Sequence, residues 1–139
     1  MLIAGHKAAT MYDVILNYKE LKQVTKFTDP FIHDVWKEEE ILLHYKQGTL
    51  QKPLLIKNDN IYLIFNGNHR ILVAINNKLT ITCKILENLD DVLIAQKVEG
   101  EDRDISGINP LTFENIVTEL IVSAEKWSSQ NPTAYIMDY

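Results

Sequence analysis

The chain has 139 residues, 46% of them hydrophobic and 24% charged, a balance typical of one folded domain over residues 1–139. Its 14 Lys and Arg residues and 19 Asp and Glu residues give a formal net charge of −5, which argues against binding nucleic acid through phosphate contacts. Cys83 is the only cysteine, so an internal disulfide and a cysteine-rich zinc site are excluded. The first residues lack the pattern of a signal peptide, and no apolar run approaches the roughly twenty residues that span a membrane. We therefore expect a cytoplasmic protein that does not enter a membrane.

The N-terminal third contains two predicted helices. Residues 11–25 show weak helical spacing, although residues 21–24 are also compatible with a short strand. The second helix is better marked, because Asp29-Pro30 supplies an N-cap and a proline at the first helical position. Apolar residues then follow a 3.6-residue period until Gly48, which we expect to end the helix as a left-handed C-cap.

The middle of the chain predicts a hairpin, a helix and a strand. Two short apolar runs, residues 53–57 and 61–65, flank Asn58-Asp59-Asn60, and this pattern is typical of a β-hairpin. Residues 69–77 are expected to form a short helix. Apolar and polar residues alternate over residues 79–85, which predicts a strand whose buried face includes the cysteine as a small hydrophobe.

The C-terminal part is predicted to be helical. Residues 89–98 form a short helix, the charged residues 99–104 a solvated turn, and Asn109-Pro110 opens the last helix. One face of that helix is apolar, and it consists of Phe113, Ile116, Val117, Leu120, Ile121, Ala124 and Trp127. This face is expected to pack into the core. As an alternative, Trp127 and the aromatic tail could contact a protein partner or a second copy of the chain.

The strand-to-helix junction at Asn66-Gly67-Asn68 is the feature that carries chemistry. A helix N-terminus presents backbone N–H groups and a partial positive charge, and Gly67, without a Cβ, lets a ligand approach the backbone. Arg70 adds a guanidinium fork for phosphate oxygens, and His69 adds a donor that can stabilise negative charge. Two cations at a helix start oppose the dipole, so they indicate an anion between them. The alternative is that Arg70 pairs with a nearby carboxylate and His69 caps the turn.

Three stretches of sequence resemble the core of the ParB/sulfiredoxin superfamily. They are Lys52-Pro53-Leu54-Leu55-Ile56, the run Tyr62 to Arg70 with its Gly67-Asn68-His69-Arg70 turn, and the strand Ile81 to Ile85 that follows Ala74. The resemblance covers residues 36–86, within a nucleotide-binding core that we place at residues 29–89, and leaves residues 90–139 as a C-terminal helical extension. It implies an α/β (α+β) fold with a small mixed β-sheet flanked by helices. It also implies that Gly67, Asn68, His69 and Arg70 bind ATP or another nucleoside triphosphate, with Mg²⁺.

Departures from the family pattern narrow the activity that the resemblance implies. Sulfiredoxins place a catalytic cysteine where this chain has Asn68, which excludes their chemistry. ParB partition proteins add a helix-turn-helix domain that we do not expect 139 residues to accommodate. Asn66 stands where the family has an acidic residue, so no metal-binding carboxylate is implied there. The family activity that the resemblance still implies is that of a free-serine kinase or related ATPase, whose G-x-H-R turn binds phosphates.

Glu39 is the candidate for the base that phosphoryl transfer requires. It interrupts the apolar face of the helix that ends at Gly48, and from there it could face the site. The alternative is that Glu39 lies in solvent beside the neighbouring glutamates. The three histidines other than His69 lack the spacing of a metal site, so no metal ligand is assigned.

Three functions follow from these features, in order of preference. The first is a nucleotide-binding enzyme, either a small-molecule or protein phosphotransferase or an ATPase. The second is a non-enzymatic regulator or inhibitor on the same fold, which binds a protein partner or forms a homodimer through the C-terminal helix. The third is a DNA-binding or nuclease role, which the net charge of −5 disfavours.

Overall fold

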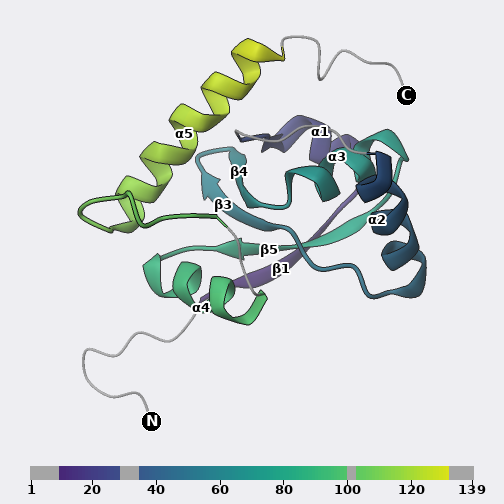
Figure 1. Ribbon diagram of the computed structural model, residues 1–139, viewed down its shortest axis with the longest axis horizontal. Helices are drawn as coiled ribbons and strands as arrows, with labels where there is room; N and C mark the ends of the chain where they lie inside the picture. Colours follow the sequence, from purple (N-terminus) through teal and green to yellow (C-terminus); the bar gives the residue numbers. More distant parts are fainter. Residues whose placement is uncertain (1–9, 29–34, 100–102, 132–139) are drawn as a thin grey trace.

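The computed structural model of the chain describes residues 10–28, 35–99 and 103–131. Within these residues five strands form one mixed sheet with helices on both faces (Figure 1), which confirms the expected mixed α/β class. In chain order the elements are β1 (Tyr12–Leu16), α1 (Tyr18–Val24), β2 (Thr25–Lys26), α2 (Val35–Gln47), β3 (Leu54–Asn58), β4 (Ile61–Asn66), α3 (Asn68–Asn76), β5 (Ile81–Leu86), α4 (Leu89–Glu99) and α5 (Phe113–Gln130). None of the helices in these described ranges has both the length and the apolar character that crossing a bilayer requires.

The sheet has the strand order β1-β5-β3-β4-β2. β3 and β4 form the predicted antiparallel hairpin, and Asp59 in its turn has a φ of 55°, a conformation that Asp and Asn tolerate better than most residues. After α3, β5 returns to pair in parallel with β3, and β1 pairs antiparallel with β5. β2 contributes only two residues, parallel to β4. Because β4 leads directly into α3, the start of α3 lies near this edge of the sheet.

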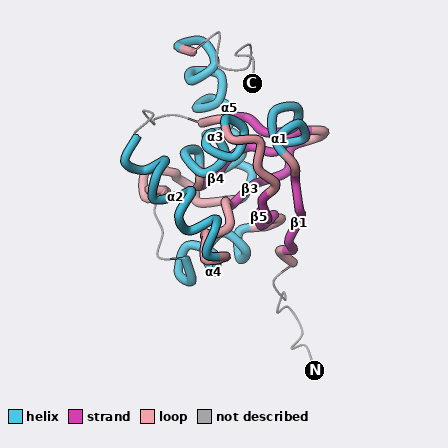
Figure 2. The backbone as a smooth tube through the Cα atoms, turned by 90° about the vertical axis from the view of Figure 1, so that its right-hand side faces the viewer, coloured by secondary structure: helices cyan, strands magenta, loops and turns pink. Residues whose placement is uncertain are grey.

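The core consists of two hydrophobic clusters, one on each face of the sheet. Side chains alternate along the strands, so Leu55 and Ile64 join the cluster under α1 and α3, whereas Leu54 and Phe65 join the cluster under α4 and α5. Figures 1 and 2 both show α3 and α4 on opposite sides of the strands. The two central strands are therefore buried on both faces, and their ends are held at fixed positions beside the first turn of α3.

The expectation of a helix over residues 11–25 is wrong for its first half. That half is strand β1, which pairs with β5, a partner too far along the chain for local spacing to reveal. Its pattern is that of an edge strand, with Ile15 70% exposed between two inward-facing neighbours. The second half is helix α1, because Asn17 and Glu20 form a reciprocal capping box. The alternative of a strand over residues 21–24 is therefore also wrong.

The other predicted elements are confirmed, with small shifts at their ends. The helix over residues 69–77, the strand over 79–85 and the helix over 89–98 correspond to α3, β5 and α4. α2 ends where Gly48 adopts a φ of 73°, as expected of a left-handed C-cap. The N-cap expected at Asp29-Pro30 lies outside the described residues.

α5 contributes its apolar face to the core, as expected. Thr112 caps its first turn by accepting a backbone hydrogen bond. Trp127, near the end of this helix, is 6% exposed, and the centres of its ring and the Phe27 ring are 4.8 Å apart. Trp127 is thus a core residue. The aromatic tail, with Tyr135 and Tyr139, lies outside the described residues.

Candidate functional site

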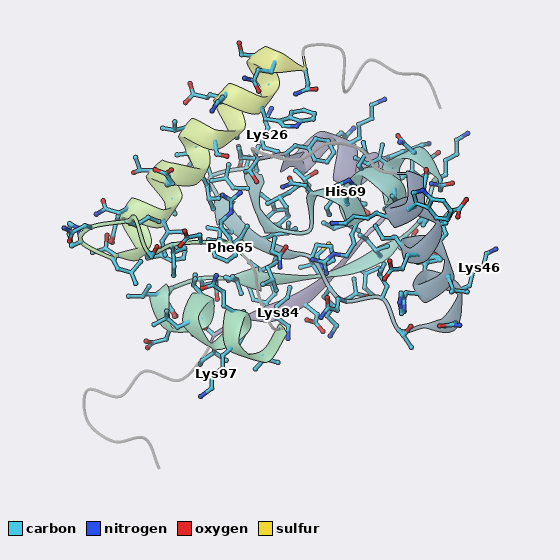
Figure 3. The ribbon with its side chains drawn as sticks, in the orientation of Figure 1. Lys26, Lys46, Phe65, His69, Lys84 and Lys97 are labelled. Atoms are coloured by element: carbon cyan, nitrogen blue, oxygen red, sulfur yellow. The ribbon has the colours of Figure 1, made fainter. Side chains whose placement is uncertain are left out.

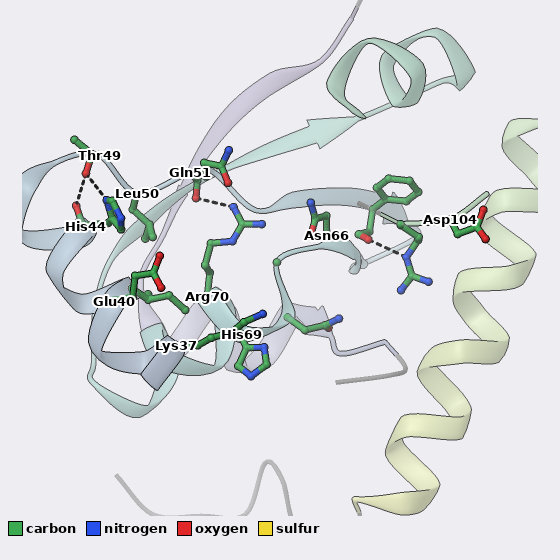
Figure 4. Close-up of a pocket in the computed structure, with 15 residues that line it drawn as sticks. Lys37, Glu40, His44, Thr49, Leu50, Gln51, Asn66, His69, Arg70 and Asp104 are labelled. Atoms are coloured by element: carbon green, nitrogen blue, oxygen red, sulfur yellow. Dashed lines mark hydrogen bonds between the residues drawn. The ribbon is translucent and has the colours of Figure 1, made fainter. Parts of the chain in front are cut away.

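A cavity of about 910 Å³ lies where the start of α3 meets α2 and the segment after α4 (Figure 4). It is lined by Lys37, Glu40, Ile41, His44, Thr49, Leu50, Gln51, Phe65, Asn66, Gly67, Asn68, His69, Arg70, Arg103 and Asp104. All four residues predicted for the phosphate-binding turn therefore line one cavity. The segments that surround it come from three separate parts of the chain.

The turn between β4 and α3 presents the start of a helix to this cavity. Gly67 is the N-cap, and the first backbone bond of the helix runs from the N–H of Ile71 to the carbonyl of Gly67 at 3.0 Å. The backbone N–H groups of Asn68, His69 and Arg70 precede that bond, and they are the donors that a helix start directs outward. The helix dipole adds a partial positive charge at the same point, so the turn favours an anion.

Gly67 is required by the packing of the turn itself. Its φ is 119°, and a Cβ there would lie 2.7 Å from the Cβ of Pro53 and 3.2 Å from Nη2 of Arg70. The sequence predicted that glycine leaves room for a ligand. The structure instead shows that the chain's own Pro53 and Arg70 occupy the space beside Gly67, so the glycine fixes the shape of the turn.

His69 and Arg70 lie on different sides of the helix start. Arg70 donates from Nη1 to the backbone carbonyl of Gln51 at 3.0 Å, which holds the guanidinium at the wall beside β3. Figure 4 shows the His69 ring on the opposite side, because successive residues on an α-helix are rotated by about 100°. Both side chains line the cavity, but they do not close on a single anion from two sides as the sequence suggested.

Asn68 has a structural role that the sequence did not indicate. Its Oδ1 accepts a hydrogen bond from the N–H of Thr28 at 2.9 Å, and its Nδ2 donates to Oγ1 of Thr28 at 3.2 Å. Oγ1 of Thr28, which is fully buried, donates to the carbonyl of Ile64 at 2.8 Å. The side chain of Asn68 thus joins the turn to the segment after β2, which leaves its backbone N–H as the group suited to bind a ligand.

Arg103, like Lys37, is a cation that sequence reasoning missed. Its Nε donates to the carbonyl of Phe65 at 2.8 Å and its Nη2 to Oγ1 of Thr28 at 2.6 Å. Residues 99–104 were expected to be a solvated turn. Arg103 and Asp104 instead line the cavity, and only the tertiary path of the chain after α4 brings them there.

α2 contributes one face to the cavity wall, and Glu39 is not on it. The lining residues Lys37, Glu40, Ile41 and His44 follow the spacing of a single helix face, whereas Glu39 is exposed and lies off that face. The acidic side chain of this wall is therefore Glu40. The sequence contained a signal for this face, because residues 37, 40, 41 and 44 have the spacing of one side of a helix. The apolar face predicted for this helix was rotated relative to it and therefore included Glu39.

The charges of the cavity differ from those of the whole chain. Lys37, Arg70 and Arg103 face Glu40 and Asp104, so the lining carries an excess of positive charge on a chain whose net charge is −5. Asp104 accepts hydrogen bonds from the backbone and the hydroxyl of Ser106, which lower the pKa of its carboxyl group. This carboxylate therefore stays ionised at the rim, and the cations favour an anionic ligand further in.

Among the described residues, no group of three or more His, Cys, Asp or Glu side chains is arranged to hold a metal ion. Comparisons of the chain with family models, with curated proteins and with solved structures found no match.

Proposed function

We propose that this protein binds the phosphates of a nucleotide in the cavity at the start of α3, on a fold of the ParB/sulfiredoxin type. One observation carries the proposal. Lys37 from α2, Arg70 from α3 and Arg103 from the segment after α4 line the same cavity, together with the N-terminus of a helix. Three cations from three elements, against the two carboxylates of Glu40 and Asp104, leave the lining with an excess of positive charge that favours an anion at the helix start.

The size and lining of the cavity support a nucleotide over a smaller anion. A volume of about 910 Å³ lies in the upper part of the range of about 300–1,000 Å³ found for small-molecule sites. Ile41 and Leu50, which are both partly exposed, add an apolar surface to the wall that suits a base. Mg²⁺ would arrive with the phosphates, which usually supply several of its oxygen ligands.

The activity that fits these groups is phosphoryl transfer, either to an acceptor molecule or to water. In such reactions positioning and charge stabilisation supply most of the catalysis. We assign charge stabilisation to His69 and Arg70. Because Glu39 lies outside the cavity, we assign the role of base to Glu40.

Isothermal titration with ATP, CTP and GTP, each with and without Mg²⁺, tests the binding proposal. We expect saturable heat with at least one triphosphate, and its loss in a His69→Ala, Arg70→Ala double variant. Lys46→Gln is the matched control, because Figure 3 shows Lys46 pointing away from the body of the protein at the far end of α2. Heat that persists unchanged in the double variant would mean that the nucleotide binds elsewhere.

A second candidate function, a non-enzymatic module that binds a protein, is favoured by the surface of α2. Trp36 is 80% exposed, which is unusual for a large aromatic side chain, and Leu43 on the same helix is 53% exposed. In a binding assay with a candidate partner, loss of binding in Trp36→Ala but not in Arg70→Gln would support this function over the first. The reverse result would support the nucleotide site.

A further inference from the structure

We infer that Arg103 makes the cavity selective for nucleoside diphosphates and triphosphates over monophosphates. This inference rests on the proposed nucleotide site and adds to it a residue from the C-terminal extension. Arg103 lies outside the Gly67-Asn68-His69-Arg70 turn in sequence, yet it lines the same cavity. It supplies a second guanidinium that only a ligand with several phosphates would reach together with Arg70.

The position of Arg103 is fixed from several sides. Its Nε is bonded to the carbonyl of Phe65 at 2.8 Å and its Nη2 to Oγ1 of Thr28 at 2.6 Å. Its guanidinium carbon lies 5.9 Å from the centre of the Phe65 ring, and Gln96 donates to its backbone carbonyl at 2.6 Å. A guanidinium held in this way needs little reorganisation on binding, so its charge is preorganised for a ligand.

Arg70 and Arg103 are anchored on opposite sides of the turn. Arg70 lies on the Pro53 side of Gly67, because a Cβ on Gly67 would lie 2.7 Å from Pro53 and 3.2 Å from Nη2 of Arg70. The anchor of Arg70, Gln51, precedes Pro53 by two residues. The anchor of Arg103, Phe65, lies two residues before Gly67 in the other direction. The two guanidinium groups are therefore bonded to carbonyls of different segments, one on each side of Gly67.

Figure 4 shows the same arrangement. It shows Asn66 between Arg70 and Asp104, the neighbour of Arg103. We expect a single phosphate group held at the start of α3 to contact only one of these two guanidinium groups. A chain of two or three phosphates can extend from Arg70, past the helix start, to Arg103. The contribution of Arg103 should therefore grow with the length of the phosphate chain.

The competing explanation is that Arg103 only clasps the turn through Phe65 and Thr28. The variant Arg103→Lys separates the two roles. Lysine keeps the positive charge but cannot reproduce the fork that bonds both acceptors. If Arg103 only holds the turn together, Arg103→Lys and Arg103→Gln should weaken binding equally. If its charge contacts the phosphate chain, Arg103→Lys should largely retain the preference for longer phosphate chains.

The experiment measures Kd for the mono-, di- and triphosphate of the nucleoside that binds in the titration above. It uses the full chain at fixed Mg²⁺ and checks each variant for folding by thermal melting. We expect the triphosphate to bind at least about tenfold more tightly than the monophosphate, the scale of one charge-assisted contact. Arg103→Gln should lower this ratio to near one without weakening the monophosphate, and Arg103→Lys should retain most of it.

Two further probes sharpen the result. Inorganic tripolyphosphate should compete with the triphosphate better than inorganic phosphate does, and this preference should also disappear in Arg103→Gln. Lys97→Gln controls for net charge, because Lys97 is exposed on α4 and points away from the body of the protein (Figure 3). It should leave every ratio unchanged.

The outcomes distinguish this inference from the proposed function. If no nucleotide binds, both fail. If mono- and triphosphate bind the wild-type protein equally, the selectivity fails while the nucleotide site stands. If both Arg103 variants weaken all nucleotides by the same factor, Arg103 is a clasp and the inference is overturned.

Discussion

Gly67 combines a backbone constraint with a packing constraint, and a single substitution tests both. Its φ of 119° is unfavourable for any residue with a Cβ, and that Cβ would lie 2.7 Å from Pro53. We expect Gly67→Ala to lower the free energy of unfolding by about 2–4 kcal/mol, measured by urea denaturation. Gly48→Ala is the matched control, because Gly48 has a φ of 73° with nothing within 4 Å. It should lower the free energy of unfolding by only about 1–2 kcal/mol. Equal effects would show that Pro53 yields to the added methyl group.

Cys83 illustrates how burial removes the reactivity of a thiol. It is fully buried in β5, and burial raises its pKa from the ordinary 9.0 to about 12, although the nearby charge of Arg70 lowers it slightly. Between these values the unfolded chain loses the thiol proton while the folded chain keeps it. Stability from this group is therefore complete below pH 9 and falls as pH rises toward 12.

The prediction for Cys83 is a difference between two proteins. Wild type should lose about 1.4 kcal/mol of unfolding free energy per pH unit above pH 9 relative to Cys83→Ala, measured by urea denaturation across that range. The comparison cancels the lysines and tyrosines that titrate in the same interval. In the native protein at neutral pH the thiol should also resist a thiol reagent until denaturant is added. Rapid native labelling would contradict the buried placement.

At the scale of elements, the junction of β4 and α3 depends on the segment after β2. Thr28 accepts hydrogen bonds from Asn68 and Arg103 and donates to the carbonyl of Ile64, all within the protein interior. Thr28→Val preserves the shape but leaves these groups without their shared partner. We expect it to lower the free energy of unfolding by about 1–3 kcal/mol, measured by thermal or urea denaturation.

The matched control for Thr28 lies on the surface of α5. Thr118 is exposed, and its hydroxyl donates only to the carbonyl of Glu114, one turn back in the same helix, at 3.0 Å. Thr118→Val should change the free energy of unfolding by less than about 0.5 kcal/mol. If Thr28→Val behaves like this control, the hydrogen bonds around Thr28 contribute little and the turn is held by packing alone.

Elements whose signals are local could be predicted from the sequence, and those with distant causes could not. The hairpin follows from Asn58-Asp59-Asn60, and the end of α2 follows from Gly48, because each signal is a backbone preference of the residue itself. β1 was mistaken for a helix because its cause is the ladder with β5. The error at Glu39 arises because the sequence does not fix the orientation of the helix about its axis. A rotation by one residue places Glu40 in the cavity wall instead.

At the scale of the whole molecule, the turn was predictable but the completed site was not. Gly67 to Arg70 are contiguous, so the sequence could group them without a fold. Lys37 and Arg103 reach the same cavity only after α2 packs against α3 and the chain returns from α4. The sequence-based site therefore contained the helix start and one guanidinium, and the tertiary structure adds the other cations and exchanges the candidate base.

The distribution of charge over the whole molecule predicts which polyanions it will bind. The net charge is −5, while the lining of this cavity holds the three cations Lys37, Arg70 and Arg103 against two carboxylates. A duplex of DNA presents a long line of phosphates that needs a surface of cations, and a protein with a net charge of −5 would repel it. Under the proposed function, a nucleotide needs only the cations of the cavity lining, Lys37, Arg70 and Arg103. We therefore expect no shift of a short DNA duplex in low-salt electrophoresis at protein concentrations that saturate with nucleotide. A duplex shift that disappears on raising the salt concentration would show that the cations form an open surface for polyanions. That result would contradict the proposal that this cavity is a nucleotide site.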